Sequence, residues 1–301
     1  MGITKAFPGL LACLIWLLPA AAPAWADGLD GPPPLREAFD PGLQADLDRT
    51  LEGLGLAPAA AEGKLAVALV DVTDPEDPRL ASVNGDRMLY AASLPKIAIL
   101  LGAFVEVERG RLALDGPTRQ SLEDMIRVSS NPEATRMLKR VGEENLLRIL
   151  QSDRFRLYDP DFNGGLWIGK AFGKAPAYHR DPLHNISHGA TALQTARFYY
   201  LLETGQMFGP GLTRQMKAIL ADPAIEHKFV KGLARFPGTR LYRKSGSWRQ
   251  WHSDSALVEQ GGYRYIAVAL AEHPQGGRWM EDLIAALHRL IVPADVAGAG
   301  S

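Results

Sequence analysis

The stretch Ser93-Leu94-Pro95-Lys96-Ile97-Ala98-Ile99-Leu100-Leu101 decides the fold prediction for this chain. Proline is tolerated in the first turn of a helix, where its missing N–H would have no partner, so Pro95 indicates a helix start near Ser93. The residues that follow are apolar nearly all round, as in a buried helix. Residues three apart share a helix face, so the Lys96 amine can reach the Ser93 hydroxyl. We therefore predict a serine nucleophile with an amine beside it, at the positive end of a buried helix.

Two further polar motifs follow in the chain. Ser129-Ser130-Asn131 comes after an amphipathic segment and precedes a helix opened by Pro132, and Lys244-Ser245-Gly246 lies in a strand-like run over 239–248. The order Ser-x-x-Lys, Ser-x-Asn, Lys-(Ser/Thr)-Gly is that of the penicillin-recognising serine enzymes. From about Asp40 to about Pro293 the chain resembles this superfamily, and most closely its class A β-lactamase branch.

The resemblance implies a role for each motif residue. Ser93 would be the nucleophile, Lys96 its base, and Ser129 the relay that returns a proton to the leaving nitrogen. The predicted substrate-binding residues are Asn131, Lys244, Ser245, Gly246 and Ser247. In the family, the backbone N–H groups at the positions of Ser93 and Ser247 form an oxyanion hole.

The chain departs from class A β-lactamases in the loop before a long helix that we expect to begin near His188. Those enzymes carry there a glutamate that activates the deacylating water, whereas Gln151 to Arg197 contains no glutamate. Asp181, His184 and His188 are the candidate substitutes, and His188 could instead cap the helix or anchor the loop. His184 and His188 are four apart, but no third ligand stands at a typical spacing, so we predict no metal and no cofactor.

Two other features bear on the substrate. The segment between Lys96 and Ser129 is shorter than in those β-lactamases, so the rim of the pocket should differ. Arginines gather near the third motif and could bind a carboxylate or form a solvated edge; they are Arg235, Arg240, Arg243 and Arg249.

Periodicity predicts strands at both ends of the chain and helices between them. The predicted strands are 65–72, 79–83, 239–248, 252–260 and 263–272, and the helices after Ser93 are 117–127, 132–140, 143–151, 189–204, 210–221, 225–235 and 280–291. Sequential hairpins imply an antiparallel five-stranded sheet, and a helix near Leu43–Leu54 and the last helix can cover it. The fold class is α/β (α+β), with a sandwich domain over 40–92 and 237–293 and an inserted all-α domain over 93–236.

The N-terminus has the pattern of a secretory signal peptide. Lys5 precedes the apolar stretch Leu10–Leu18, and Ala24-Trp25-Ala26 is a small-x-small cleavage site, so residues 1–26 should be removed. A flexible leader over 27–39 and a tail over 294–301 would flank the domains. Cys13, the only cysteine, lies within the predicted signal, so we expect a periplasmic or secreted chain without disulfides. No later run is apolar enough to span a membrane.

Charge and composition limit the classes of molecule that this chain is expected to bind. The net charge is −1 and there is no basic block, so nucleic acid is not an expected partner. We expect a monomer that acts by acyl transfer through a Ser93 acyl-enzyme on a β-lactam. The alternatives are a D,D-peptidase or esterase on cell-wall peptides or esters, and a penicillin-binding protein with negligible turnover.

Overall fold

The computed structural model describes residues 1–2 and 31–298. Contacts divide the chain into two units, Met1–Gly31 and Pro32–Ser301, and every described helix and strand belongs to the second. The predicted signal peptide, with Cys13 and the cleavage site after Ala26, lies outside the described residues except for its first two. Within the part of the chain that is described, no helix is long and apolar enough to cross a bilayer.

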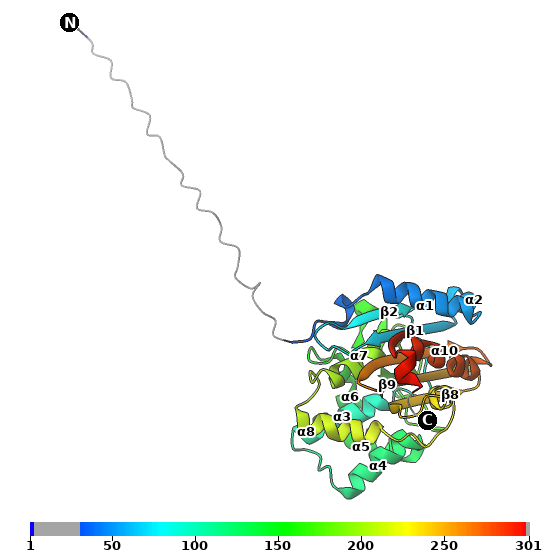
Figure 1. The fold of residues 1–301 in the computed structure, drawn as a ribbon. Helices are drawn as coiled ribbons and strands as arrows, with labels where there is room; N and C mark the ends of the chain where they lie inside the picture. Colours follow the sequence, from blue (N-terminus) through cyan, green and yellow to red (C-terminus); the bar gives the residue numbers. More distant parts are fainter. Residues whose placement is uncertain (3–30, 299–301) are drawn as a thin grey trace. The chain divides into compact units, whose positions relative to one another are not determined.

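A five-stranded antiparallel sheet forms the centre of the second unit, as predicted (Figure 1). Its spatial order is β2-β1-β10-β9-β8, so β8 is an edge strand. The strands are β1 (Leu65–Asp71), β2 (Arg79–Val83), β8 (Arg240–Trp248), β9 (Trp251–Gln260) and β10 (Tyr263–Glu272). In the register of the last hairpins, Lys244 lies opposite Ser255.

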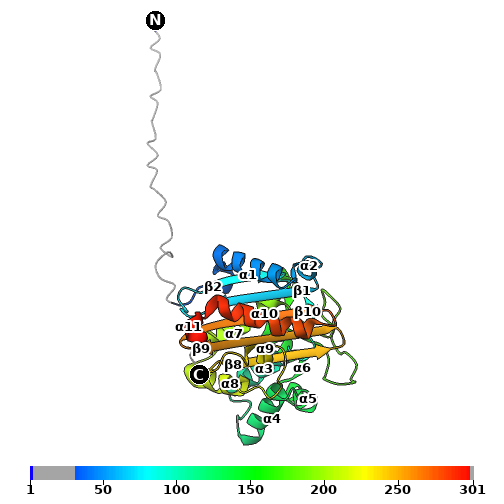
Figure 2. The same cartoon turned by 45° about the vertical axis from the view of Figure 1, so that its right-hand side comes forward.

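The sheet has a hydrophobic core on each face because successive side chains of a strand point to opposite sides. Val67 and Leu69 of β1 belong to the core on one face, and Ala68 and Val70 belong to the core on the other. The first core is covered by α1 (Pro41–Gly53) and α10 (Gly276–Ile291), which lie on the same face in Figure 2. The two terminal helices therefore cover one side of the sheet, as the sequence predicted.

Helices from the middle of the chain cover the other face. Helix α7 (Ala192–Glu203) packs on β1 and β10, and Thr191 caps it by accepting a hydrogen bond from the Gln194 N–H. The remaining helices of this region are α3 (Lys96–Glu108), α4 (Gly116–Arg127), α5 (Asn131–Val141), α6 (Glu143–Gln151) and α8 (Pro210–Leu220). Helix α9 (Phe229–Leu233) instead packs against α10, and its Phe229 and Leu233 belong to the core on the first face. Helices α4 and α8 contact the edge strand β8. Short helices α2 (Ala57–Ala61) and α11 (Ala294–Ala297) complete the unit.

The middle region is not purely helical, which corrects the predicted all-α insertion. A small sheet joins β3 (Leu89–Tyr90), β7 (His188–Ala190) and β6 (Trp167–Ile168). Strand β4 (Tyr158–Asp159) pairs with β5 (Gly164–Gly165), and a 3₁₀ turn, η2 (Pro160–Phe162), connects the two. The helix predicted over 189–204 begins at Ala192, because the residues before it pair as strand β7.

Two further boundaries differ from prediction. The helix predicted over 225–235 is only α9, since Lys228 has a positive φ of 52°. The second half of the predicted flexible leader is ordered in the structure. Residues Leu35–Glu37 form a 3₁₀ turn, η1, with the Leu35 side chain buried, and Phe39 forms a bridge with Leu80 of β2.

Candidate active site

Ser93 lies in the turn that joins β3 to α3. The helix itself begins at Lys96, slightly later than predicted, because the Lys96 N–H bonds to the Ser93 carbonyl in a tighter i→i+3 turn at 3.2 Å. The turn is held from both sides: the Ala91 N–H donates to the His188 carbonyl at 3.0 Å, and Ser253 Oγ donates to the Ala91 carbonyl at 2.8 Å. Ala92 has a φ of 51°, a strained conformation for a residue with a Cβ, and such strain clusters at functional sites.

Lys96 is fully buried and directed at the second motif. Its Nζ donates to the Ser129 carbonyl at 2.6 Å and to Asn131 Oδ1 at 2.8 Å, with Ser129 Oγ at 3.3 Å. Burial lowers the pKa of Lys96 to about 7, because the charged form loses its hydration. Among the described side chains no hydrogen bond joins Lys96 to Ser93. In this structure the amine of the predicted base therefore hydrogen-bonds to Ser129 and Asn131 and not to the predicted nucleophile.

Ser129 Oγ stands between two buried lysines. Lys244 Nζ donates to it at 3.0 Å and to the Ser245 carbonyl at 2.6 Å, while Lys96 approaches at 3.3 Å. Burial lowers the pKa of Lys244 well below its usual range, and the Lys96 charge adds to this effect. Ser129 itself has a φ of 58°, so the backbone is strained here too. Its hydroxyl accepts from both lysines and keeps its own proton for a third partner.

The third motif brings the edge strand against the nucleophile turn. A Cβ added to Gly246 would lie 2.2 Å from the Ala91 carbonyl oxygen and 2.7 Å from the Ser93 nitrogen. Only glycine fits such a close backbone approach. Ser245 is buried and Ser247 is exposed on the same strand. The structure thus gathers Ser93, Gly246 and the two lysines at one place on the sheet edge.

Lys228 is a site residue that the sequence analysis missed. Its buried Nζ donates to the Gly246 carbonyl at 2.6 Å, to Ser247 Oγ at 2.8 Å and to the Ser253 carbonyl at 3.0 Å. Burial lowers its pKa to about 8. Lys228 therefore links β8, which carries the third motif, to β9 through hydrogen bonds. No motif or periodicity marks Lys228, and its contacts depend on the turn before α9.

Of the arginines near the third motif, Arg243 is held by a buried carboxylate. Arg243 forms a buried ion pair with Asp254, with Nη2 at 2.7 Å and Nε at 2.8 Å from its carboxylate oxygens. Asp254 also accepts from the Phe229 N–H at 3.1 Å. Arg243 therefore joins β8, β9 and α9, and it is not free to bind a substrate carboxylate.

Of the three candidate deacylation bases, Asp181 organises the loop. It is buried, accepts from the Tyr158 hydroxyl with one oxygen, and accepts from the His184 N–H at 2.5 Å with the other. His184 Nε2 is 3.1 Å from the Asn163 carbonyl. Both residues are thus engaged within the loop, and no hydrogen bond joins either of them to the predicted site residues in the described part of the chain.

His188 is the candidate base that adjoins the site. Its Nε2 is 3.0 Å from the Lys170 carbonyl, so this nitrogen carries the proton and Nδ1 keeps a lone pair. Burial lowers the pKa of His188 to about 4, and the charges of Lys170 and Lys96 act in the same direction. The residue lies in β7, so it anchors the loop and does not cap α7. The imidazole is neutral near pH 7.

Phe172 occupies the space beside Lys96. Its ring centre is 4.7 Å from Lys96 Nζ and 4.4 Å from the centre of the His188 ring, which stacks on it. Thr135 fixes the phenylalanine backbone, with Thr135 Oγ1 at 3.1 Å from the Phe172 nitrogen. An apolar ring thus stands between the two groups that could move protons at this site.

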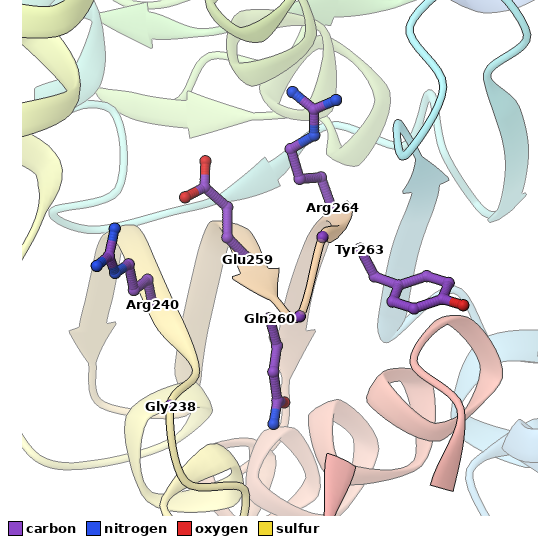
Figure 3. A pocket seen from close by; sticks show the side chains of 8 residues that line it. Gly238, Arg240, Glu259, Gln260, Tyr263 and Arg264 are labelled. Carbon is purple, nitrogen blue, oxygen red and sulfur yellow. The ribbon is translucent and has the colours of Figure 1, made fainter. Parts of the chain in front are cut away.

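A hollow of about 590 Å³ lies at the Arg240 end of β8 (Figure 3). Arg240, Glu259 and Arg264 line it together with the turn between β9 and β10. Glu259 pairs with Lys217 at 2.7 Å, and Arg264 pairs with Glu203 at 2.8 Å. None of the predicted site residues lines this hollow, and its carboxylates are already paired. No group of three metal-ligating side chains gathers within the described ranges.

Comparisons with known proteins identify the family and the fold of the chain. The model of the beta-lactamase enzyme family matches residues 46–121 and 117–294. Among solved structures, PBP-A superposes with a TM-score of 0.62 at 16% identity, over 82% of this chain and 96% of its own. A β-lactamase from Sphaerobacter thermophilus DSM 20745 gives 0.61 at 19% identity, over 81% and 99%. One from Chitinophaga pinensis DSM 2588 gives 0.62 at 15% identity, over 80% and 97%. At these identities the likeness shows a shared fold. A search of curated proteins finds no match.

Proposed function

The chain belongs to the beta-lactamase enzyme family, and on that premise we propose that it is an exported serine hydrolase that opens β-lactams through a Ser93 acyl-enzyme. The observation that carries the proposal is the position of Ser129 Oγ between Lys96 Nζ, at 3.3 Å, and Lys244 Nζ, at 3.0 Å. The Ser129 hydroxyl thus connects Lys96 of the first motif to Lys244 of the third.

Acylation would use Ser93, Lys96 and Ser129, with Lys96 turning from its present partners to the Ser93 hydroxyl. Lys96 has a pKa of about 7, so a large fraction is the free amine near neutral pH and can accept the Ser93 proton. Ser93 Oγ then bonds to the lactam carbonyl carbon, and the lactam C–N bond breaks. The nitrogen takes a proton from Ser129, whose hydroxyl recovers one from Lys96. The net proton transfer is from Ser93 to the leaving nitrogen.

Electrostatic stabilisation would come from the edge strand and the nucleophile turn. The N–H groups of Ser93 and Ser247 are the proposed oxyanion donors, and the approach of Gly246 to the Ser93 nitrogen supports their proximity. Lys244 and Ser245 would hold the substrate carboxylate, and Asn131 would bind the acyl side chain while it orients Lys96 at 2.8 Å.

Deacylation needs a base for water, and we assign it to His188. Water would lose a proton to Nδ1 and bond to the ester carbon, and Ser93 would leave with a proton. A base with a pKa of about 4 is weak at neutral pH, so this step should limit turnover. The position of Phe172 beside Lys96 also favours the second candidate function, a penicillin-binding protein with slow turnover.

The intact mass of the protein, followed over time after mixing with a penicillin, tests both functions. The parent chain should gain one penicillin mass, and Ser93→Ala should gain none while remaining folded. Ser152→Ala, which removes a serine at the end of α6, should label like the parent. Labelling that persists in Ser93→Ala would contradict the assignment. An adduct-free parent that cleaves D-alanyl peptides or simple esters would support the peptidase or esterase alternative.

Export is a separate part of the proposal. Cleavage after Ala26 would release a periplasmic or secreted chain that begins at Asp27, and we expect it to be a monomer. The N-terminal sequence of protein from the periplasmic fraction, together with its mass in solution, checks both points. An uncleaved N-terminus, or a stable dimer, would contradict them.

A further inference from the structure

A hollow of about 320 Å³ lies between η1, the segment around η2, and α7. Three arginines line it: Arg36 from η1, Arg156 from the segment before β4, and Arg197 from α7. None of the residues assigned to the candidate active site takes part. We refer to it as the Arg197 hollow.

Two of the three guanidinium groups are neutralised. Arg36 binds both carboxylate oxygens of Asp86, at 2.5 and 3.0 Å, and lies 3.7 Å above the centre of the Phe162 ring. Arg156 binds Asp159 at 2.5 Å. These pairs fix the walls of the hollow and leave little of their charge available.

Arg197 has no such partner. Its Nη1 is buried and forms no hydrogen bond with the described part of the chain. Burial lowers the pKa of Arg197, and the charges of Arg156 and Arg36 add to the effect, whereas Asp159 opposes it. Arginine nevertheless stays protonated in proteins. Glu37 at the rim is exposed and forms no ion pair with it. The hollow therefore holds one cation whose charge is not locally matched.

Gln194 supplies an unpaired acceptor beside this cation. Its Nε2 donates to the Arg156 carbonyl at 3.0 Å, and its buried Oε1 has no partner among the described residues. Gln194 is 1% exposed, residues three apart share one face of a helix, and both Gln194 and Arg197 line this hollow. The site thus lacks both an acceptor for Arg197 and a donor for Gln194.

We propose that the Arg197 hollow binds a small carboxylate that carries a hydroxyl or ammonium donor on the neighbouring carbon. The carboxylate pairs with Arg197, and the donor bonds to Gln194 Oε1. One ligand then satisfies both buried groups, which a simple anion does not.

Glycolate, glycine and acetate are the probes. Each is titrated at constant ionic strength against the mature chain, with the melting temperature and NMR shifts as readouts. Glycolate or glycine should stabilise the parent in a saturable way, and acetate should bind about fivefold more weakly because it leaves Gln194 unpaired. Covalent labelling by a penicillin, which uses none of these residues, reports that each variant is folded.

Three variants make the test specific. Arg197→Met should abolish the response, Gln194→Met should remove the advantage of glycolate over acetate, and the exposed Arg214→Met on α8 should behave as the parent. If Arg197→Met fails to fold, Arg197→Lys replaces it, with weaker binding expected because the bidentate fork is lost. A parent that responds to none of the probes overturns the proposal. So does an equal response in the parent and in the Arg197 variant, since water would then satisfy the hollow.

Discussion

The ammonium of Lys96 lies 4.7 Å from the centre of the Phe172 ring, on which the His188 imidazole stacks at 4.4 Å. An aromatic ring stabilises a cation but accepts no proton. The ring therefore occupies space beside Lys96 without supplying a group that can accept a proton from water. Under the proposed function, this site therefore provides groups for opening a β-lactam but no strong base for hydrolysis of the acyl-enzyme.

A chromogenic cephalosporin should give a burst followed by a slow steady state. Acylation would use Ser93, Lys96 and Ser129, whereas loss of a positioned base costs a factor of about 10² to 10⁴ in deacylation. Replacement of His188 by alanine should slow the steady state further, and His184→Ala should not, because His184 bonds to Asn163 away from Lys96. Fast linear hydrolysis without a burst would show that another group activates the water.

A carboxylate at position 172 should speed the slow phase. Phe172→Glu would bring an oxygen near Lys96 and His188, and we expect a gain of about tenfold in deacylation. Phe172→Leu is the matched control, since it removes the ring without adding a base. An equal gain in both variants would mean that space, and not proton transfer, had limited the step.

The acylation rate should rise with pH and level off above about pH 7. Lys96 acts as a base only when neutral, and its pKa is about 7, so kcat/KM should fall about tenfold per pH unit below that value. His188, with a pKa of about 4, stays neutral over this range and adds no second inflection. The profile of burst rates against pH checks this, and a flat profile would exclude Lys96 as the base.

Alanine at Gly246 should separate activity from stability. The new Cβ would meet the Ala91 carbonyl at 2.2 Å, so strand or turn must shift, and a displacement near 1 Å costs about 10²-fold in rate. The free energy of unfolding should fall by only about 1–3 kcal/mol. Gly53→Ala in α1, where a Cβ meets nothing within 4 Å, is the control. Full activity in Gly246→Ala would disprove the close approach.

Removal of the Lys228 amine should destabilise the fold. Lys228→Met leaves the buried carbonyls of Gly246 and Ser253 without this donor, which costs about 2–4 kcal/mol in unfolding free energy. Acylation should slow as well, because β8 loses its support. Urea denaturation measures the first effect. Lys231→Met, an exposed neighbour on α9, should change stability by less than about 0.5 kcal/mol.

Strong local sequence patterns made the five-stranded sheet and most of the helices predictable. The strand runs at both ends alternate or are continuously apolar, and Pro41, Pro132 and Pro210 stand at helix starts, as proline should. The predicted antiparallel sheet is confirmed. The roles assigned to the site residues stay predictions, although the motif residues Lys96, Ser129 and Lys244 do meet through hydrogen bonds.

What escaped prediction depends on contacts between distant segments. Strands β3 to β7 have two or three residues each, too few for a periodic pattern. Strands β3 and β6 form by pairing with β7, which is distant from β3 in the sequence, whereas β4 pairs only with the nearby β5. Lys228 enters the site through a strained backbone that no composition signals. Nothing in the sequence places Phe172 beside Lys96.

The edge position of β8 has a consequence for the behaviour of the protein at high concentration. Strand β8 pairs with β9 on one side only, so an extended chain can add to its free side through main-chain hydrogen bonds. That chain could be a peptide or another copy of the protein. Helices α4 and α8 lie against this strand, and the Ser93 turn closes on Gly246, so strand addition is restricted to the last residues, where Trp248 is 56% exposed. The short exposed length of this strand should therefore limit self-association.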